Sequence, residues 1–229
     1  MRWTKEVKSM GQYYIPVIVL ADNIKKAFYS HAYGNGLKLM EHSYVGNNFV
    51  NAVLHEIFEG PYAGQRLVWL GDYAEYFVDP KKIHNDYAPG ILNTNPDIGP
   101  ILSEADFTEL MKVHEADTKT DRIFVHNMNE KTAQLPPAHR YVVNFDKHEY
   151  IDLVEWTKVM DKEYPSHGWT VHPIPLLCSV GNRNGGGDYR GADDEACGRW
   201  AYDKIGVFNE VPEEAKSFDD VTFCWVFHE

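Results

Sequence analysis

Apolar residues recur at three- and four-residue steps between positions 45 and 58 of the chain. This spacing places one apolar face along a helix, and the Gly60-Pro61 pair that follows is a typical stop signal. We therefore predict a helix with Phe49, Val53 and Ile57 in the core. Two shorter helices are predicted, one over residues 154–162 and one over residues 103–113. The second opens with a sequence, SEAD, that resembles a capping box.

Runs of β-branched and aromatic residues predict the strands. Residues 13–21 read YYIPVIVLA, and Pro16 within this run suggests a sheet edge or a bulge. Residues 27–33 are interpreted as the return strand of a hairpin. In the second half, Asp146-Lys147 predicts a two-residue turn between strands at 141–145 and 148–153. Further strands are predicted over residues 66–73, 122–126, 205–208 and 221–227, the last inside a sheet because it is apolar on both faces.

Strands outnumber helices in this pattern, and their order is irregular. The sequence therefore predicts an α+β fold with a mixed or antiparallel sheet and a few helices. Residues 79–102 contain four prolines, which favours a long surface or binding loop. Each half alone offers too little apolar surface for a core of its own. We therefore expect residues 1–229 to form a single globular domain whose halves share one sheet.

Composition narrows the class of protein. The chain has 229 residues, 44% hydrophobic and 14% aromatic, which is enough for a buried core and excludes disorder as the main state. Its longest apolar run, residues 15–21, is far short of the roughly 20 residues of a membrane span. The formal net charge of −12 argues against direct binding to nucleic acid. Residues 1–10 show no secretory signal, so a cytoplasmic location and no membrane partner are expected.

The cysteines and histidines indicate neither disulfides nor a metal. Cys178, Cys197 and Cys224 are odd in number and form no CxxC pair, which favours free thiols. Cys178 has apolar neighbours typical of a core residue, and nothing nearby supplies the base that a nucleophile needs. The 11 histidines match no metal-binding motif. His31 and His42 could nevertheless face one another across a glycine turn.

The most unusual segment is residues 178–203, CSVGNRNGGGDYRGADDEACGRWAYD. Three consecutive glycines allow backbone N–H groups to approach an anion, and neighbouring Asn and Arg side chains suit phosphate or carboxylate. Arg199 beside Trp200 offers a guanidinium and a stacking face, although such a pair equally seals a sheet edge. A passive loop is the structural alternative, because no known phosphate-binding fingerprint is present. The predicted ligand-binding residues are Asn182, Asn184, Gly185, Gly186, Gly187, Asp188, Arg190, Arg199 and Trp200.

Catalysis in the same pocket is an open alternative. An aspartate could act as general base with His172 as its acid–base partner. Asp72 follows a predicted buried strand and Gly71, although an aspartate in such a turn often bonds only its own backbone. No GxSxG motif supports a serine triad. The catalytic candidates are Asp72, His172, Asp188 and Asp203, and no cofactor is predicted.

Several strings resemble an uncharacterised family of bacterial and phage or prophage proteins. They are YVVNFDKHEYIDL at 141–153, HPIPLL at 172–177, GNRNGGGDYRG at 181–191 and GRWAYDKI at 198–205, with SHAYGNG at 30–36 and RLVWLGDYA at 66–74 in the first half. This family carries no settled activity. The resemblance implies a small cytosolic accessory protein, in the host cytoplasm if phage-encoded, and transfers no catalytic residue.

Three functions stay open on these observations. The first is binding of a small phosphorylated or nucleotide-like ligand in a pocket lined by Gly, Arg and Trp. The second is a hydrolase or transferase that uses Asp and His in that pocket. The third is an acidic inhibitor that offers carboxylates to a protein partner. It ranks last because acidic residues cluster only briefly, at 193–195, 213–214 and 219–220.

Overall fold

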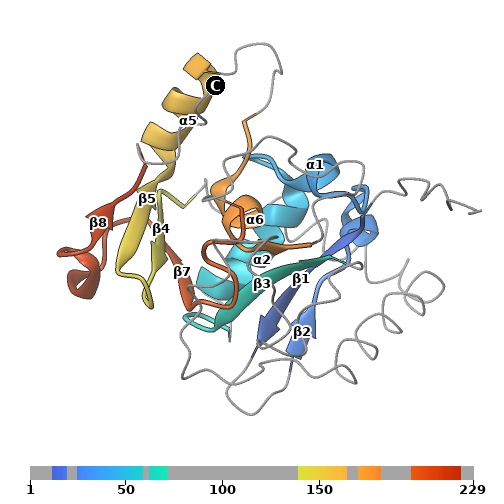
Figure 1. Cartoon of the computed structure of the whole chain (residues 1–229), viewed down its shortest axis with the longest axis horizontal. Coiled ribbons are helices and arrows are strands. Elements are labelled where there is room, and N and C mark those ends of the chain that lie inside the picture. Colours follow the sequence, from blue (N-terminus) through green and yellow to red (C-terminus); the bar gives the residue numbers. More distant parts are fainter. Residues whose placement is uncertain are drawn as a thin grey trace, which may run out of the picture.

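The computed structural model describes residues 12–19, 25–58, 62–71, 139–163, 170–181 and 197–222. These ranges form an α+β fold with two four-stranded sheets, ordered β2-β1-β3-β6 and β7-β4-β5-β8 (Figure 1). The strands are β1 (Tyr14–Val19), β2 (Lys25–Ala27), β3 (Arg66–Gly71), β4 (Tyr141–Asn144), β5 (Glu149–Asp152), β6 (Ser179–Val180), β7 (Ile205–Phe208) and β8 (Asp219–Asp220). The helices are η1 (Ser30–Tyr33), α1 (Leu39–His42), α2 (Asn48–Phe58), α5 (Leu153–Glu163), α6 (Pro173–Leu177) and η4 (Glu213–Ala215).

β1 is an interior strand, so the edge position that Pro16 suggested is wrong. β1 pairs antiparallel with β2 on one side and with β3 over its whole length on the other. Pro16 lies just beyond the β2 ladder, where its carbonyl accepts the N–H of Phe28 at 3.1 Å. Because the proline nitrogen faces the end of the short β2, the ladder with β3 loses no donor. The return strand, β2, overlaps the predicted range 27–33 only at Ala27.

α2 confirms the predicted helix, although it begins at Asn48 rather than Val45. Asn47 Oδ1 accepts the N–H groups of Phe49 and Val50 at 2.9 and 3.2 Å. This cap satisfies donors that the first helical turn leaves unpaired. Phe49, Val53 and Ile57 are buried, as the periodicity predicted.

β4 and β5 confirm the second predicted hairpin, but their connection is longer than expected. Asn144 pairs with Glu149, so residues 145–148 form a four-residue turn. Asn144 Oδ1 accepts the N–H groups of Asp146 and Lys147 at 3.0 and 2.9 Å, and His148 adopts a positive φ of 56°. An asparagine that bonds its own turn in this way stabilises the longer connection. The predicted strand at 205–208 and the helix at 154–162 are confirmed by β7 and α5, and the strand at 66–73 is confirmed by β3 over residues 66–71, beyond which the described range ends.

Both halves of the chain contribute to one cluster of buried residues. It includes Ile57 of α2, Trp69 of β3, Val142 of β4 and Ile205 of β7. β6, from the second half, pairs in parallel with β3, whereas β4, β5, β7 and β8 form their own sheet. The prediction that the halves share one sheet is therefore correct for β6 and wrong for the other strands of the second half.

Some predictions lie outside the described residues. They are the loop at 79–102, the helix at 103–113, the strand at 122–126 and most of the strand at 221–227, together with Cys224. Within the described ranges, no helix is long and apolar enough to cross a membrane.

Candidate functional site

β3 and β6 end side by side because they run in parallel. Trp69 pairs with Ser179 and Leu70 with Val180, which brings Gly71 next to Gly181 at the carboxyl ends of the two strands. In the sequence, Asp72 follows Gly71, and the glycine-rich segment follows Gly181. Asp72, Asn182, Asn184, Gly185, Gly186, Gly187, Asp188 and Arg190 lie outside the described residues. The two glycines nevertheless fix the point from which both predicted functional segments start.

The side chain of Gln12 packs directly on the two glycines and is buried. A methyl group at Gly181 would lie 2.5 Å from Gln12 Oε1, and one at Gly71 would lie 2.8 Å from Gln12 Cδ. Both distances are too short for a contact, so a side chain at either position would displace the end of the Gln12 side chain, and at Gly181 the end of the Tyr14 side chain as well. Tyr14 Oη donates a hydrogen bond to Gln12 Oε1 at 3.2 Å. The strand ends therefore meet an amide and a phenol, which are neutral hydrogen-bonding groups.

His172, a predicted acid–base residue, caps α6 instead of facing a carboxylate. Its Nδ1 accepts the N–H of Ile174 at 3.1 Å, and its own backbone N–H donates to the Ser43 carbonyl at 3.1 Å. Burial, together with the nearby His139, lowers the pKa of His172 to about 3. The ring is therefore neutral, with its proton on Nε2, which has no hydrogen-bond partner among the described residues. A group with this pKa does not exchange protons efficiently near pH 7.

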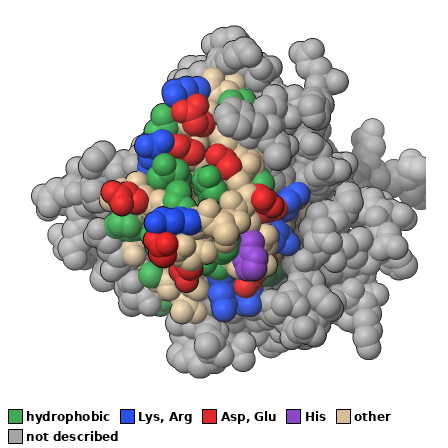
Figure 2. Space-filling model, turned by 90° about the vertical axis from the view of Figure 1, so that its left-hand side faces the viewer, with side chains coloured by type: hydrophobic (Ala, Val, Ile, Leu, Met, Phe, Trp, Pro, Cys, Tyr) green, Lys and Arg blue, Asp and Glu red, His purple; other side chains and the backbone are tan. Residues whose placement is uncertain are grey.

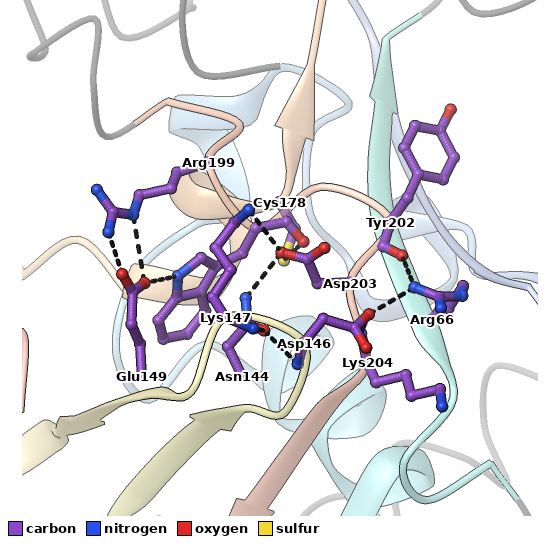
Figure 3. Close-up of polar contacts among 11 residues, drawn as sticks. Arg66, Asn144, Asp146, Lys147, Glu149, Cys178, Arg199, Tyr202, Asp203 and Lys204 are labelled. Carbon is purple, nitrogen blue, oxygen red and sulfur yellow. Dashed lines mark hydrogen bonds and ion pairs between the residues drawn. The ribbon is translucent and has the colours of Figure 1, made fainter. Parts of the chain in front are cut away.

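A second group of polar residues, the inter-sheet cluster, joins the β4–β5 turn to the segment that precedes β7 (Figure 3). Glu149, on β5, is the hydrogen-bond acceptor for Arg199 and Trp200 in this cluster. Its carboxylate accepts from Arg199 Nε at 3.2 Å, from Arg199 Nη2, and from Trp200 Nε1 at 2.7 Å. The cluster consists of Arg66, Asn144, Asp146, Lys147, Glu149, Arg199, Trp200 and Asp203.

This geometry corrects the ligand-binding role predicted for Arg199 and Trp200. The Trp200 side chain is 0% exposed, so neither face of its ring is open for stacking. Its backbone N–H also donates to the Leu177 carbonyl at 2.8 Å, which ties it to the end of α6. The guanidinium of Arg199 is engaged with Glu149 through two nitrogens. The Trp200 ring is therefore closed to stacking, and the Arg199 guanidinium is held by an ion pair with Glu149.

Asp203 also lies in the inter-sheet cluster, buried at 3% exposure. Its carboxylate accepts from Asn144 Nδ2 at 2.9 Å, and Lys147 Nζ lies 3.5 Å away (Figure 3). Burial raises the pKa of Asp203, and the Asn144 hydrogen bond and the Lys147 charge oppose that rise. Its backbone carbonyl accepts the N–H of Leu67 at 3.1 Å, which links the two sheets. These contacts give Asp203 a structural role.

Cys178 confirms the prediction of a core cysteine. The side chain is buried, and its Sγ lies 3.8 Å from the Trp200 carbonyl oxygen. Burial, and then the charge of Asp203, raise the pKa of this thiol well above its ordinary value. A thiol in such surroundings stays protonated and unreactive near neutral pH.

The histidines expected to face one another have separate partners. His42 is buried, its Nδ1 is 3.0 Å from the Gly36 carbonyl oxygen, and its Nε2 accepts from Trp69 Nε1 at 3.1 Å. His31 is exposed and hydrogen-bonds Tyr29 Oη through its Nδ1 at 2.9 Å. Within the described ranges, no group of three or more His, Cys, Asp or Glu side chains is arranged to hold a metal ion.

Gln12 and Glu149 are the residues that the sequence analysis missed. Gln12 lies two residues before β1, and Glu149 occupies an alternating strand position, so neither belongs to a motif. Comparison with protein-family models, with curated proteins and with solved structures finds no match to this chain.

Proposed function

We propose that this chain binds a small phosphorylated or nucleotide-like ligand at the carboxyl ends of β3 and β6. The observation that supports this proposal is the adjacency of Gly71 and Gly181, where the two parallel strands end. Ligands of open sheets commonly bind outside the carboxyl ends of parallel strands, where the following loops diverge. Gln12 and Tyr14 add neutral hydrogen-bonding groups at this point.

The chemistry of the segments that begin there suits an anion. Residues 182–190 supply asparagine amides, two arginines and three consecutive glycine N–H groups. With a net charge of −12, the chain as a whole repels anions, so binding must depend on these local donors. The proposed ligand is held by the backbone amides at Gly185-Gly186-Gly187 and by Arg190, with no part for Arg199 or Trp200.

The proposal includes the setting that the sequence suggests. We place the protein in the cytoplasm, or in the host cytoplasm if it is phage-encoded, as an accessory protein. The free thiol of Cys178, which is buried, fits a reducing compartment.

The experiment is a titration of the full chain with nucleoside mono-, di- and triphosphates and with phosphorylated sugars, followed by calorimetry and thermal shift. We expect at least one of these compounds to bind and to raise the Tm. Gly186→Val and Arg190→Ala should each abolish binding and leave the ligand-free Tm almost unchanged. Lys158→Ala, which removes an exposed cation on α5, is the matched control and should bind as wild type.

Two outcomes would contradict the proposal. One is the absence of binding by every compound in the panel. The other is binding by Arg190→Ala at wild-type affinity. If Gly186→Val unfolds the chain, the glycines serve packing, and Arg190→Ala alone then decides the question.

A further inference from the structure

The outer face of the second sheet differs from an ordinary solvated face. Val142, Ile151 and Val207 belong to the buried core, so they mark the inner face of β4, β5 and β7. Side chains alternate along a strand, so the neighbouring positions point to the opposite side. These positions hold Tyr141, Val143 and Phe145 from β4 and its turn, Tyr150 from β5, and Phe208 from β7.

The rings on this face pack on one another. Tyr141 and Tyr150 have ring centroids 6.1 Å apart, and Phe145 lies edge-on to Phe208 at 6.0 Å and to Phe218 at 6.3 Å. Val143 lies on the same face and is fully buried. Each of the five rings is still partly exposed. Figure 2 views the side of the molecule where β8 lies and shows hydrophobic side chains at the surface among acidic and basic ones.

Carboxylates border this aromatic face. Asp220 on β8 pairs with Tyr150 on β5 and is exposed. After burial, the charge of Asp220 is the largest cause that raises the pKa of the Tyr150 phenol, which places the carboxylate close to the ring. The other exposed acids of residues 209–220 are Glu210, Glu213, Glu214 and Asp219, of which Asp219 lies on the side of β8 opposite Tyr150. The one lysine in this range, Lys216, is already paired with Glu213.

β8 also presents backbone groups at the edge of the sheet. The N–H groups of Asp219 and Val221 donate to the carbonyls of His148 and Tyr150, both at 3.0 Å. In a parallel ladder the intervening residue points its N–H and C=O the other way, so those of Asp220 face outward. An edge strand that carries charged side chains resists pairing with a copy of itself. A segment with basic side chains would not be repelled by the acidic side chains of β8.

We propose that this face docks a protein partner through an extended segment that carries Lys or Arg side chains. The ring of Tyr150 attracts a cation, and Asp220, its neighbour on β8, pairs with that cation, whereas the Tyr141 ring already has the guanidinium of Arg140 over it, 5.0 Å from the ring centroid. β8 is the edge of its sheet among the described residues, and its outward backbone groups hydrogen-bond the backbone of the segment, as in other cases of strand addition. A second copy of this chain is a poor occupant, because its acidic border would meet the same acidic border.

The test uses the full chain and a capped peptide of alternating lysine and valine, with a glutamate–valine peptide as matched control. We expect the lysine peptide to bind in calorimetry and to shift the NMR signals of Tyr150 and Asp220, while the glutamate peptide does neither. The double variant Asp219→Lys, Asp220→Lys should weaken binding at least tenfold. Asp220 Oδ1 accepts the Thr222 N–H at 3.0 Å, so the double variant should lose some stability, and binding is compared at a temperature at which both proteins are folded. Lys158→Glu, on α5, should bind as wild type.

Three results would overturn the proposal. The first is equal binding of the lysine peptide to the double variant and to wild type. The second is a set of shifted signals that excludes Tyr150 and Asp220. The third is concentration-dependent dimerisation that the double variant abolishes, since it would assign the face to a second copy of the chain. None of these results bears on the proposed ligand site at β3 and β6, which the phosphate panel tests separately.

Discussion

Two buried histidines should make the stability of this protein fall steeply in mild acid. Trp69 Nε1 can only donate, so His42 Nε2 must accept from it, and the proton of the neutral ring then lies on Nδ1, facing the Gly36 carbonyl. Protonating Nε2 would break the bond to Trp69 in a buried site. Burial lowers the pKa of His42 to about 4, and burial with the nearby His139 lowers that of His172 to about 3.

The size of the effect follows from these values. In the unfolded chain each histidine titrates near its ordinary pKa of about 6.5. Below that pH the unfolded chain takes up protons that the native state refuses, so the free energy of unfolding falls as the pH falls. The fall ends only when the native histidines protonate, near pH 4 and 3. At about 1.36 kcal/mol per pKa unit, going from pH 7.5 to 5.0 costs about 2 kcal/mol for each histidine. The sum, about 4 kcal/mol, is a large part of the roughly 5–15 kcal/mol typical of a domain.

The assay is urea unfolding at pH 7.5 and at pH 5.0, followed by tryptophan fluorescence. His42→Gln removes the titrating ring and keeps an acceptor for Trp69. We expect it to be less stable than wild type at pH 7.5 and to lose about 2 kcal/mol less on going to pH 5.0. Comparing the two proteins cancels the contributions of the carboxylates, which they share. His31→Gln, an exposed replacement of the same kind, is the control. Equal losses in wild type and His42→Gln would refute the reasoning.

Three further predictions concern packing. Ile57→Ala should lower the free energy of unfolding by about 2–5 kcal/mol, because the side chain is buried and its removal leaves a cavity; an unchanged denaturation midpoint would mean that the helical face is misread. Glu149→Ala should cost about 2–3 kcal/mol in the same assay, since Arg199 and Trp200 lose a charged acceptor, and Glu149→Gln should recover part of the loss. Gly181→Ala should cost about 1–3 kcal/mol by overpacking against the Gln12 amide and the Tyr14 hydroxyl, and adding Gln12→Ala should remove part of that cost; purely additive effects would contradict the close contact with Gln12.

The sequence predicted correctly the elements whose residues carry a clear local pattern, such as an apolar repeat or a turn between two apolar runs. α2 has its apolar period, and β4 and β5 flank an evident turn. The errors arise where tertiary pairing decides the outcome. Pro16 is tolerated in an interior strand because β2 stops before reaching it, and nothing in the local sequence shows where β2 stops. The turn length is a local error instead: Asn144 accepts the N–H groups of the residues two and three positions later, a contact that depends on its side-chain rotamer.

The candidate site was predicted only in part, for the same reason. The carboxyl end of β3 was recognised from its Gly-Asp turn, but its pairing with β6 is a long-range contact that no local pattern reveals. The Arg199–Trp200 pair was interpreted as a stacking site because such a pair often is one. What decides its role is Glu149, a single carboxylate 51 residues before Trp200 in the chain. Nothing in the sequence around Glu149 indicates that its side chain binds the buried indole of Trp200.

The anchoring of the glycine-rich segment links the inter-sheet cluster to the proposed ligand site. At its start, Gly181 follows β6, which pairs with β3. At its end, Gly198 donates its N–H to the Leu176 carbonyl of α6 at 3.1 Å, and Glu149 holds Arg199 and Trp200 directly after it. Both ends are therefore tied to the same short unit, α6 and β6. Fixing the ends of a loop removes part of the conformational entropy that a ligand would otherwise have to remove on binding. On the proposed function, the cluster would favour binding through Glu149 without any of its residues touching the ligand.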